Sequence, residues 1–540
     1  MKKIATIVIL TSLILSCSED FLDRYPTTST VIESYYKTPE DGTQALTAVY
    51  NMLLRDDYWS PIIYSELASD VCAGGAGSGD GGGFQRTDRF IQQPNADANG
   101  DAWSVYYGGI ARANIYLENE ELIDWTGHEA QKLQYQAEAR FLRAYFHFIL
   151  ARMFGEVPAL DHVITDEVLP RTPAEELYGF ILDDLVFCIE NGLTSPYASI
   201  TEANWGRANK WAAEAMFTRV YLYYSGYYAD ETCGDYTASN ALTYIEDVID
   251  YGGFDLVTPY ASLWRVPTYS ELGDDSLITA YAGEINPEVV WSIRYAGGQT
   301  GYGSSNWQRM IGPRNTNIDP YGQGWGAMTV LPDFWESFED GDSRKTASIL
   351  SWEDEGITYD WVTNAQAQYT GYNCKKYEIA SINGTPEPRP DWQTDAFEDY
   401  MVIRFSDVLL MAAELQLNSG NSGAALGYVN QVVERAFGDN SHNYSTLTID
   451  DIFQERKLEL AFEGVRYWDI LRSCKGDFTK LADILTYVDE NDGGDYSQSS
   501  NTESLDVDGN NFVDKKGLFQ IPQDELDLMG GIIEQNPGYE

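Results

Sequence analysis

The sequence predicts a mostly α-helical protein built from repeated pairs of antiparallel helices, with an irregular region of loops and short strands beside them. Two observations predict this fold class. Long segments that carry apolar residues every three to four positions recur along the chain, and small residues stand where neighbouring segments would cross. Residues 255–400 are instead rich in Gly, Trp, Tyr, Asn and Pro and show few helical stripes, which is typical of loops that carry function.

The composition sets broad limits on the class of protein. The chain has 540 residues, of which 44% are hydrophobic, so it can bury a large core. Aromatic residues make up 14%, an excess that suits core packing and also flat contacts with sugar rings. The formal net charge of −49 argues against DNA or RNA as a partner, because phosphates attract Lys and Arg. None of the six cysteines lies in a CxxC pair, so no zinc or thioredoxin-like site is predicted.

The N-terminus reads as an export signal. Two lysines precede an apolar stretch, residues 4–15, that is too short for a comfortable membrane-spanning helix. The stretch ends at Leu15-Ser16-Cys17, which resembles a bacterial lipobox. We therefore expect a signal peptide over residues 1–16, cleavage before Cys17 and lipid attachment to its thiol, which would anchor the protein without a membrane span. An ordinary signal peptide followed by a chance cysteine is the alternative.

The strongest helical pattern lies over residues 128–155. Thr126 and Glu129 form a capping-box pattern at its start, and Gly155 marks its end. The predicted buried stripe of this helix consists of Leu133, Ala137, Phe141, Ala144 and Phe148. His147 lies beside the stripe, and we interpret it as a packed core residue rather than a catalytic one.

Further helices follow with start and stop signals of their own. Thr172 and Pro173 open one that runs to about Asn191, with the threonine as its predicted cap. The others are predicted over residues 207–225, 240–251, 405–419, 423–437 and 449–472, the last broken near Gly464. Repeated helix pairs with small residues at their crossings resemble a tetratricopeptide array, although the strict signature of that repeat is not present.

Motifs of catalysis are few. Gly77, Gly79 and Gly82 spell GxGxxG, but their flanks do not read as the βαβ unit of a dinucleotide site. No P-loop, HExxH or GxSxG motif is present. Carboxylates are plentiful, so counting does not exclude the acid pair of a glycosidase, but nothing in the sequence singles out a pair.

Residues 506–514 read DVDGNNFVD and half match a calcium loop. Positions 1, 3, 5 and 9 of such a loop would be filled by Asp506, Asp508, Asn510 and Asp514. The glycine and the glutamate that the loop needs further on are missing. A polar surface turn is therefore the better interpretation, with a structural calcium ion as the alternative, and we expect no other cofactor.

Seven stretches, in order along nearly the whole chain, carry a family resemblance. They are CSEDFLDRYP (17–26), WSVYYGGIARAN (103–114), EARFLRAYFHFILARMFGEVP (138–158), GRANKWAAEAMFTRVYLYYSG (206–226), IRFSDVLLMAAEL (403–415), FQERKLELAFEGVRYWDILR (453–472) and LFQIPQDELDLMGGIIEQNPGY (518–539). Together they resemble the SusD/RagB-like outer-membrane nutrient-binding lipoproteins. Residues 255–400 match least, in the part of the chain where members of this family differ in ligand.

The resemblance implies a TPR-like helical scaffold, no enzymatic activity and a place outside the cell on a lipid anchor in the outer membrane. It also implies that the protein captures an oligosaccharide or polysaccharide and delivers it to a SusC-like TonB-dependent transporter, over which it acts as a lid. The divisions expected on this basis are a lipoprotein signal peptide (1–16), an N-terminal TPR-like helical part (17–254), a variable ligand-binding region (255–400) and a C-terminal SusD/RagB helical part (401–540). Glu459, Glu463 and Arg466 are expected to form ion pairs within the scaffold rather than to contact ligand.

Residues 74–83 are mostly glycine, which lets a backbone approach a ligand closely. A domain linker is the alternative, but linkers rarely lie so deep within a scaffold. We expect a mobile ligand-facing loop here, with residues 297–326 as the opposite wall. The candidate ligand-binding residues are Trp307, Trp325, Tyr302, Tyr321, Phe84, Asp70, Arg86 and Arg309. Trp307 and Trp325 are favoured because glycine and polar residues flank them, which indicates exposure.

The sequence leaves two other functions as alternatives. One is a peptide-binding uptake lipoprotein of the RagB type, and the other is a surface glycosidase. Product formation from a polysaccharide would identify the glycosidase, whereas glycan binding that depends on Trp307 and Trp325 would identify the glycan-binding protein.

Overall fold

The computed structural model describes most of the chain. The described residues are 35–55, 61–77, 79–93, 99–164, 168–272, 280–295, 306–316, 318–382, 385–386, 396, 398–489 and 504–539. The predicted signal peptide, Cys17 and Tyr302 lie outside them. None of the helices within these ranges is long and apolar enough to cross a membrane.

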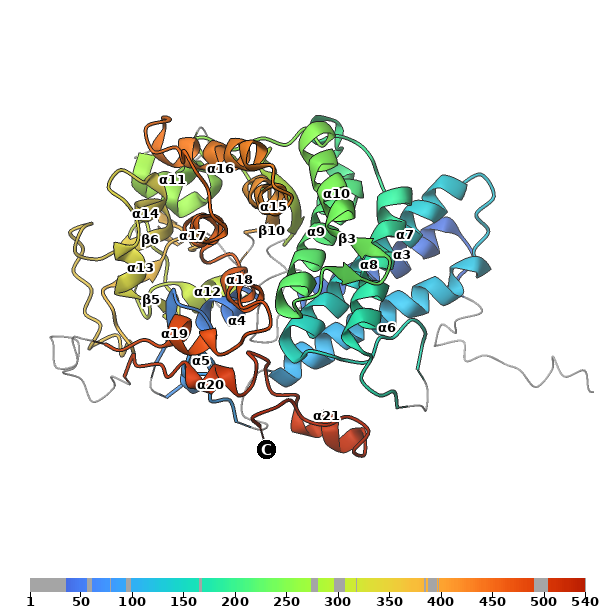
Figure 1. Ribbon diagram of the computed structural model, residues 1–540, viewed down its shortest axis with the longest axis horizontal. Helices are drawn as coiled ribbons and strands as arrows, with labels where there is room; N and C mark the ends of the chain where they lie inside the picture. Colours follow the sequence, from blue (N-terminus) through green and yellow to red (C-terminus); the bar gives the residue numbers. More distant parts are fainter. Residues whose placement is uncertain are drawn as a thin grey trace, which may run out of the picture.

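Six helices lie side by side at one end of the molecule, on the right of Figure 1. They are α3 (Pro39–Tyr50), α6 (Asn99–Asn119), α7 (Glu129–Phe154), α8 (Ala174–Asn191), α9 (Lys210–Tyr227) and α10 (Ala238–Tyr251). Each helix from α6 to α10 packs against the next one along the chain. This is the arrangement that the repeated helix pairs predicted.

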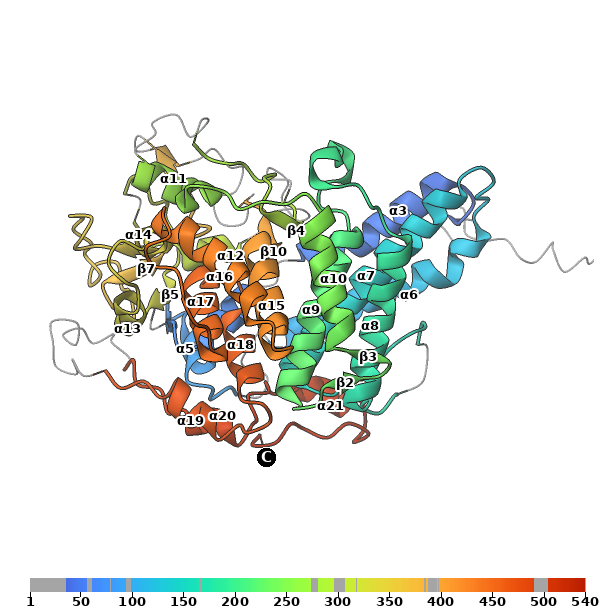
Figure 2. The same cartoon turned by 45° about the horizontal axis from the view of Figure 1, so that its top comes forward.

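Four helices from the C-terminal part continue this stack towards the other end of the molecule (Figure 2). They are α15 (Phe405–Asn418), α16 (Ser422–Phe437), α17 (Ile449–Leu460) and α18 (Arg466–Ser473). The first, α15, packs against α10 and α16, and α18 packs against α9. The two ends of the sequence therefore build one scaffold around the residues between them.

Short helices connect and cover these layers. They are α4 (Pro61–Leu67), α5 (Gly82–Asp88), α11 (Arg265–Leu272), α12 (Trp307–Ile311), α13 (Pro332–Glu336), α14 (Ser343–Ser348), α19 (Lys480–Leu485), α20 (Asn510–Val513) and α21 (Gln523–Leu528). Single turns of 3₁₀-helix lie at Asn51–Leu54, Glu120–Leu122, Tyr197–Ser199, Glu202–Asn204 and Tyr260–Leu263.

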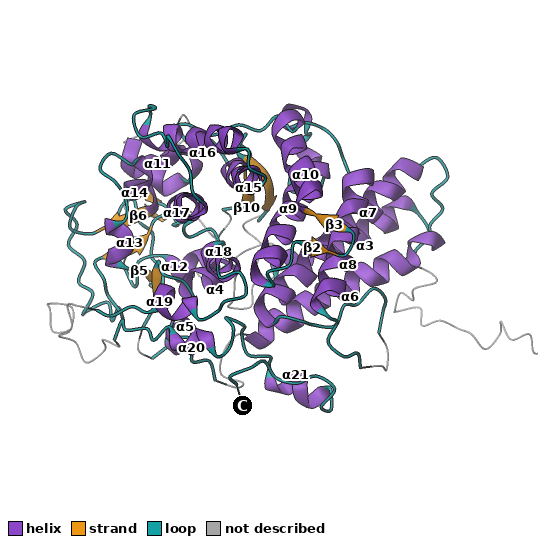
Figure 3. Ribbon diagram, in the orientation of Figure 1, coloured by secondary structure: helices purple, strands orange, loops and turns teal. Residues whose placement is uncertain are grey.

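The strands are short and gather mainly at the end opposite the helix stack (Figure 3). One antiparallel sheet has the order β1-β5-β7-β6, with β1 (Cys72–Gly75), β5 (Ala327–Val330), β7 (Tyr372–Cys374) and β6 (Ile349–Ser351). Three two-stranded sheets pair β4 (Val289–Ile293) with β10 (Tyr400–Arg404), β2 (Thr232–Cys233) with β3 (Tyr236–Thr237), and β8 (Ser381–Ile382) with β9 (Thr385–Pro386). The loops and short strands expected over residues 255–400 are thus present.

Two predicted helix starts differ from the structure. Thr126 donates its hydroxyl to the Asp124 carboxylate at 2.6 Å, so α7 has no side-chain cap and its N-cap residue is His128. Thr172 likewise does not cap α8, because its hydroxyl accepts from the backbone N–H of Ala159 at 2.9 Å. In each case a nearby polar group competes for the hydroxyl that would otherwise satisfy the first turn.

The buried stripe of α7 is confirmed except at its first member. Leu133 is 44% exposed, whereas the next four members are buried. His147 is fully buried, as predicted. Its Nε2 accepts from the Leu160 N–H at 3.1 Å, and burial lowers its pKa to about 3, so the ring is neutral.

The break predicted near Gly464 separates α17 from α18. Gly464 has φ +78°, and a Cβ there would lie 2.8 Å from the Tyr400 hydroxyl. The buried Glu66 carboxylate of α4 accepts the N–H groups of Phe462 and Gly464 at 2.9 and 3.0 Å. A side chain from a distant segment therefore satisfies the backbone donors that the break leaves open.

Buried ion pairs join the C-terminal helices to the variable region. Glu459 on α17 accepts from Arg404 at 2.9 Å, from Arg344 at 3.3 Å and from Arg435. Glu463 pairs with Arg404 at 2.6 Å. These contacts confirm that the two glutamates serve the scaffold, because each satisfies a guanidinium taken out of water.

Candidate functional site

The glycine segment forms a hydrogen-bonded strand–turn–helix unit. Its first part is β1, in which Gly75 pairs with Ala327 of β5, and its last part begins α5. A Cβ at Gly74 would lie 2.6 Å from the Gln85 backbone, so glycine lets α5 pack directly on the strand. Between them, the Gly77 N–H donates to the Asp80 carboxylate at 2.9 Å. The segment is therefore part of the sheet, and only its central turn has the character of the predicted loop.

The turn meets two other segments. The carbonyl of Gly326 accepts from the Ala76 N–H at 2.5 Å, and the carbonyl of Ala76 accepts from the Ala367 N–H at 2.8 Å. The carboxylate of Asp80 accepts from Arg314 at 2.7 Å. The structure thus brings the glycine segment against residues 312–326, the later part of the expected wall at 297–326, and adds residues 359–368 as a third segment.

Four of the predicted ligand residues are held within the protein. Trp307 is 2% exposed and packs against the rings of Tyr377 and Tyr400, with centroids 5.0 and 6.0 Å away. Its predicted exposure is wrong, because the glycine and polar residues beside it in sequence do not cover it in space. Tyr321 is fully buried, and Arg309 is 4% exposed with Nη1 donating to a backbone carbonyl.

Asp70 is the fourth. Its carboxylate accepts from Arg466 at 2.7 Å and from Lys457 at 2.8 Å, so its acceptor sites are used within the scaffold. Burial alone would raise its pKa, but these two cations outweigh burial and hold the pKa well below the ordinary value. The predicted scaffold role of Arg466 is confirmed by the same contact.

Three predicted residues lie closer to the surface. Phe84 and Arg86 on α5 are half-buried, and Phe84 packs against the main core. Trp325 is half-buried, and its carbonyl accepts from Arg314 Nη1 at 2.9 Å. These are the predicted residues whose exposure is compatible with ligand contact.

A surface around Arg314 holds further candidates that the sequence did not single out. Asp80 and Asn315 are exposed, and Asn315 Nδ2 donates to the Asn364 carbonyl at 3.1 Å. Trp361, three residues before Asn364, is half-buried. We name the surface formed by Asp80, Arg314, Asn315, Trp325 and Trp361 the glycine-loop face.

Stacked aromatic rings support one side of this face. The Trp361 ring lies parallel to that of Tyr369, with centroids 5.5 Å apart and an interplanar angle of 9°. Behind them, Trp352 stacks on Tyr359 at 4.5 Å, and the Tyr359 hydroxyl donates to the Arg314 carbonyl at 2.9 Å. The platform under Trp361 is thus fixed to the segment that carries Arg314.

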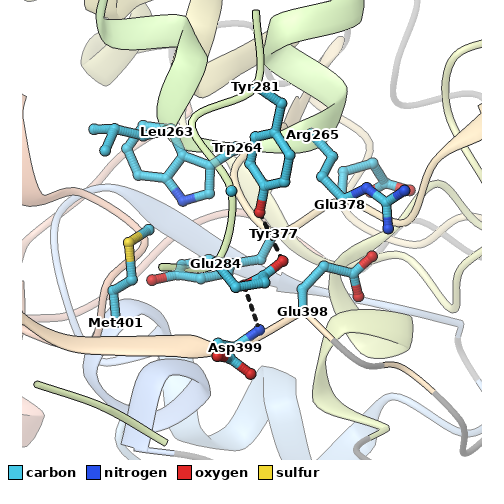
Figure 4. Close-up of a pocket in the computed structure, with 11 residues that line it drawn as sticks. Leu263, Trp264, Arg265, Tyr281, Glu284, Tyr377, Glu378, Glu398, Asp399 and Met401 are labelled. Atoms are coloured by element: carbon cyan, nitrogen blue, oxygen red, sulfur yellow. Dashed lines mark hydrogen bonds between the residues drawn. The ribbon is translucent and has the colours of Figure 1, made fainter. Parts of the chain in front are cut away.

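A narrow acidic pocket is lined by residues 263–265, by residues of the loop that precedes β4, by Tyr377 and Glu378, and by residues at the start of β10 (Figure 4). Glu284 accepts from the Tyr281 hydroxyl at 2.6 Å and from the Asp399 N–H at 2.9 Å. Burial, helped by Asp399, raises the pKa of Glu284 to about 7, and burial raises the pKa of Asp399 to about 6. The enclosed space is about 10 Å³, which holds a water molecule but no sugar ring.

The calcium pattern at residues 506–514 does not form a binding loop. Asp508 accepts from the N–H of Asn510 at 3.0 Å and leads into the short helix α20, whereas Asp506 accepts from the Asp489 N–H at 2.9 Å. Nowhere in the described parts of the chain are three or more His, Cys, Asp or Glu side chains grouped so as to hold a metal ion. The polar surface turn is the interpretation that this geometry favours.

Comparisons with known proteins cover nearly the whole chain. A model described as the SusD family matches residues 287–394 and 359–539, and one described as starch-binding and associating with the outer membrane matches residues 20–222. SusD-like protein P2 of Formosa agariphila is 25% identical, over 99% of this chain and 99% of its own length. The starch-binding protein SusD of Bacteroides thetaiotaomicron is 23% identical, over 67% of this chain and 68% of its own.

Solved structures show the same architecture. The surface glycan-binding protein A of Bacteroides fluxus has a TM-score of 0.75 and 25% identity, over 93% of this chain and 100% of that chain. The protein of the same name from Bacteroides thetaiotaomicron, in complex with laminarihexaose, has a TM-score of 0.72 and 22% identity, over 92% of this chain and 99% of that chain. The predicted fold class is therefore confirmed.

Proposed function

The chain belongs to the SusD family, as its seven stretches indicated, and from this premise we propose that it captures an oligosaccharide or polysaccharide at the glycine-loop face. The observation that carries the proposal is the half-buried Trp361 ring, stacked on Tyr369 and placed beside exposed polar side chains. Relatives are described as starch-binding or glycan-binding proteins, which supports the same class of ligand.

The chemistry of the face fits a sugar. The C–H faces of a sugar ring pack against an aromatic ring, and hydroxyl groups at the ring edge need donors and acceptors nearby. Trp361 and Trp325 offer the rings. Arg314 offers guanidinium donors, and Asp80 offers an exposed carboxylate. The side-chain amide of Asn315 completes a mixed apolar and polar surface, in which the two charged groups, Asp80 and Arg314, are paired with each other.

The first experiment is a binding screen. The soluble chain beginning after Cys17 is tested by affinity gel and calorimetry against neutral plant, fungal and host glycans. We expect one glycan class to bind, and expect Trp361→Ala and Trp325→Ala to weaken binding about tenfold or more. Trp205→Ala is the matched control, because Trp205 is also half-buried with one ring partner, Tyr197 at 5.3 Å.

The outcomes separate the remaining candidates. Unchanged glycan binding in both variants of the face would move the site elsewhere. Peptide binding without glycan binding would identify a peptide-uptake protein of the RagB type. Release of products from a polysaccharide would identify a glycosidase, with a site other than the acidic pocket, which is too small for a sugar.

Delivery to a membrane transporter forms the second part of the proposal. Cys17 would carry the lipid that anchors the chain to the outer membrane with its body outside the cell, and the bound glycan would pass to a SusC-like TonB-dependent transporter beneath it. The family description that mentions outer-membrane association supports this location. Co-purification of such a transporter with the full-length chain, and release of the chain from membranes in Cys17→Ser, are the tests.

A further inference from the structure

A buried arginine without a counter-ion lies where the two groups of helices meet. Arg152, in the last turn of α7, is 6% exposed. Its guanidinium carbon lies 4.3 Å from the centre of the Phe148 ring of α7 and 4.8 Å from that of the Trp468 ring of α18. Trp468 in turn meets Tyr223 of α9, with ring centroids 6.3 Å apart, where α9 and α18 pack together (Figure 2). Arg152 is therefore held between the N-terminal helix stack and the C-terminal helices.

The guanidinium of Arg152 has no acceptor. Across the described ranges, this side chain forms neither an ion pair nor a hydrogen bond. Its Nε is enclosed, whereas the two terminal nitrogens, which also lack acceptors, retain some exposed surface. Burial lowers the pKa of Arg152, but an arginine starts so far above neutral pH that it stays charged. A buried charge that is neither paired nor hydrogen-bonded is strongly unfavourable, so a positive charge is left to be compensated.

The groups around Arg152 do not compensate this charge. The charged side chain that acts on it most is a second cation, Arg219. Arg219 pairs with Asp407, whose carboxylate also accepts from Arg456 at 2.6 Å and so already serves two arginines. The Arg152 guanidinium lies over Phe148, one turn earlier in α7, and thus points away from the carbonyl groups at the end of the helix. The faces of two aromatic rings offset only part of a full charge.

Other donors without acceptors surround the guanidinium. The hydroxyls of Tyr178 and Tyr223 and the indole Nε1 of Trp468 are enclosed and have no hydrogen-bond partner among the residues that the structure describes. Both tyrosine rings pack on Phe148, with centroids 6.4 and 5.9 Å away. The hydroxyl of Tyr145, a further neighbour of the guanidinium, likewise has no partner in the described part of the chain. Guanidinium and indole N–H groups can only donate, so this place lacks an acceptor.

We propose that a small monovalent anion of the class of chloride binds the Arg152 guanidinium between α7, α9 and α18. It would accept from the terminal nitrogens of Arg152, and the Tyr145 hydroxyl would turn towards it. One anion of single charge compensates the single unpaired arginine, whereas a divalent anion would leave a buried negative charge. A water molecule fits less well, because it is neutral and leaves the charge of Arg152 uncompensated.

The first test compares stability in chloride and in gluconate, an organic anion too bulky for an enclosed site. The thermal unfolding midpoint of the soluble chain beginning after Cys17 is recorded in the two sodium salts at the same ionic strength of about 0.2 M, so that general screening is equal. The site exists only where three helices meet, so the anion binds the folded state and not the unfolded chain. We expect chloride to raise the midpoint by about 1–2 °C, the shift expected from one such ion in a protein of this size.

Three variants decide whether Arg152 is responsible. Arg152→Met removes the charge and keeps a long unbranched side chain, so it should fold and lose the chloride-dependent shift. Tyr145→Phe removes one donor hydroxyl and keeps the ring, so it should reduce the shift. Arg140→Met is the matched control on the same helix. Arg140 lies over the Phe187 ring at 4.2 Å, but its side chain is 37% exposed and pairs with Asp184 at 3.7 Å, so this variant should keep the full shift.

Bromide locates the site directly. Bromide has the charge and the hydrogen-bonding chemistry of chloride and is only slightly larger. Crystals of the chain grown in sodium bromide should therefore show an anomalous peak within hydrogen-bonding distance of the terminal nitrogens of Arg152.

Three results would overturn the proposal. They are equal midpoints of the wild type in the two salts, a chloride-dependent shift that Arg152→Met retains, and crystals without bromide at Arg152. Bromide at Arg152 without a chloride-dependent shift would mean binding at crystal concentration only, and would also overturn it. The wild-type measurements and Tyr145→Phe decide the question if Arg152→Met fails to fold. None of these measurements uses a glycan, so their outcome is independent of the glycine-loop face.

Discussion

Asp80 and Arg314 form an ion pair at 2.7 Å although 234 positions separate them in sequence. The pair joins the turn of the glycine segment to the segment that carries Trp325 and Asn315. The Asp80 carboxylate is 61% exposed, whereas the Arg314 side chain is 13% exposed. The two partners should therefore differ in what their loss costs.

Removal of Asp80 should affect binding more than folding. For Asp80→Ala we expect the free energy of unfolding to fall by less than about 1 kcal/mol, because the carboxylate is mostly exposed and both its ion pair and its hydrogen bond from the Gly77 N–H compete with water. We expect glycan affinity to fall severalfold, because Arg314 loses the partner that orients it. Chemical denaturation and calorimetry on the same samples measure the two quantities.

Arg314→Gln is the companion variant. It should cost about 1 kcal/mol of stability as well as affinity, because the Trp325 carbonyl also loses its donor. A larger stability loss in Asp80→Ala than in Arg314→Gln would contradict this account of the pair.

The helical scaffold was predictable from sequence because its signal is local. The apolar stripe of α7 and the small residues of α9 carry the helical period in their own segments, so helices appear where predicted, with ends shifted by a few residues. The capping role of Thr126 was not predictable, because Asp124 competes for the same hydroxyl. The composition of residues 255–400 indicated loops but could not give the strand partners, which lie far away in sequence.

The ligand face was predictable only as a region. The glycine segment approaches the later part of the predicted wall at 297–326, as predicted. The exposure of single aromatic rings, in contrast, could not be predicted from the residues beside them in sequence. Trp307 packs on Tyr377 and Tyr400, which follow it by 70 and 93 positions. No sequence pattern at these three positions predicts that their rings meet. Trp361 lies in an ordinary polar stretch, so the signal that singles it out, its stack on Tyr369, exists only in the folded chain.

Glu459 should be among the most costly single residues to neutralise. Burial alone would raise its pKa, but Arg435, Arg404 and Arg344 outweigh burial and hold the pKa below the ordinary value. Glu459→Gln removes the negative charge that offsets the positive charge of these buried guanidinium groups. We therefore expect a loss of about 3–5 kcal/mol in the free energy of unfolding. Glu434→Gln, an exposed change on the neighbouring helix α16, should stay within about 0.5 kcal/mol of wild type. Similar denaturation midpoints for the two variants would disprove a structural role for the network.

Glu284 should make the protein less stable as the pH rises, whereas a salt-bridged carboxylate makes a protein more stable as the pH rises. Its pKa rises from 4.5 to about 7 on folding, so the folded state binds the proton more tightly than the unfolded state. Its contribution to stability is therefore present below pH 4.5, is lost as the pH rises to about 7, and is constant above that.

Glu284→Gln removes this dependence. Relative to wild type, we expect the variant to gain on the order of 2 kcal/mol between pH 4.5 and pH 8, measured by denaturant unfolding at a series of pH values. Glu353→Gln, at an exposed position, should give a curve parallel to that of wild type. A parallel curve for Glu284→Gln as well would show that Glu284 is ionised in the folded protein throughout this range.

Two glycines in helices should respond to alanine with opposite signs. Gly226 lies in α9, where a Cβ would come within 2.5 Å of the Arg472 carbonyl oxygen and 2.8 Å of the Arg472 Cβ. Neither atom can move without shifting α18, so Gly226→Ala should cost about 1–3 kcal/mol. Gly427 lies in the exposed part of α16 with no atom within 4 Å of such a Cβ, so Gly427→Ala should add about 0.5–1 kcal/mol through helix propensity.

Thermal or denaturant unfolding of the two variants side by side tests the close approach of α9 to α18. Gly427→Ala shows that the assay resolves a gain in helix propensity, so a loss in Gly226→Ala is then attributable to the clash with Arg472. A Gly226→Ala protein as stable as wild type would mean that α18 lies further from α9 than described.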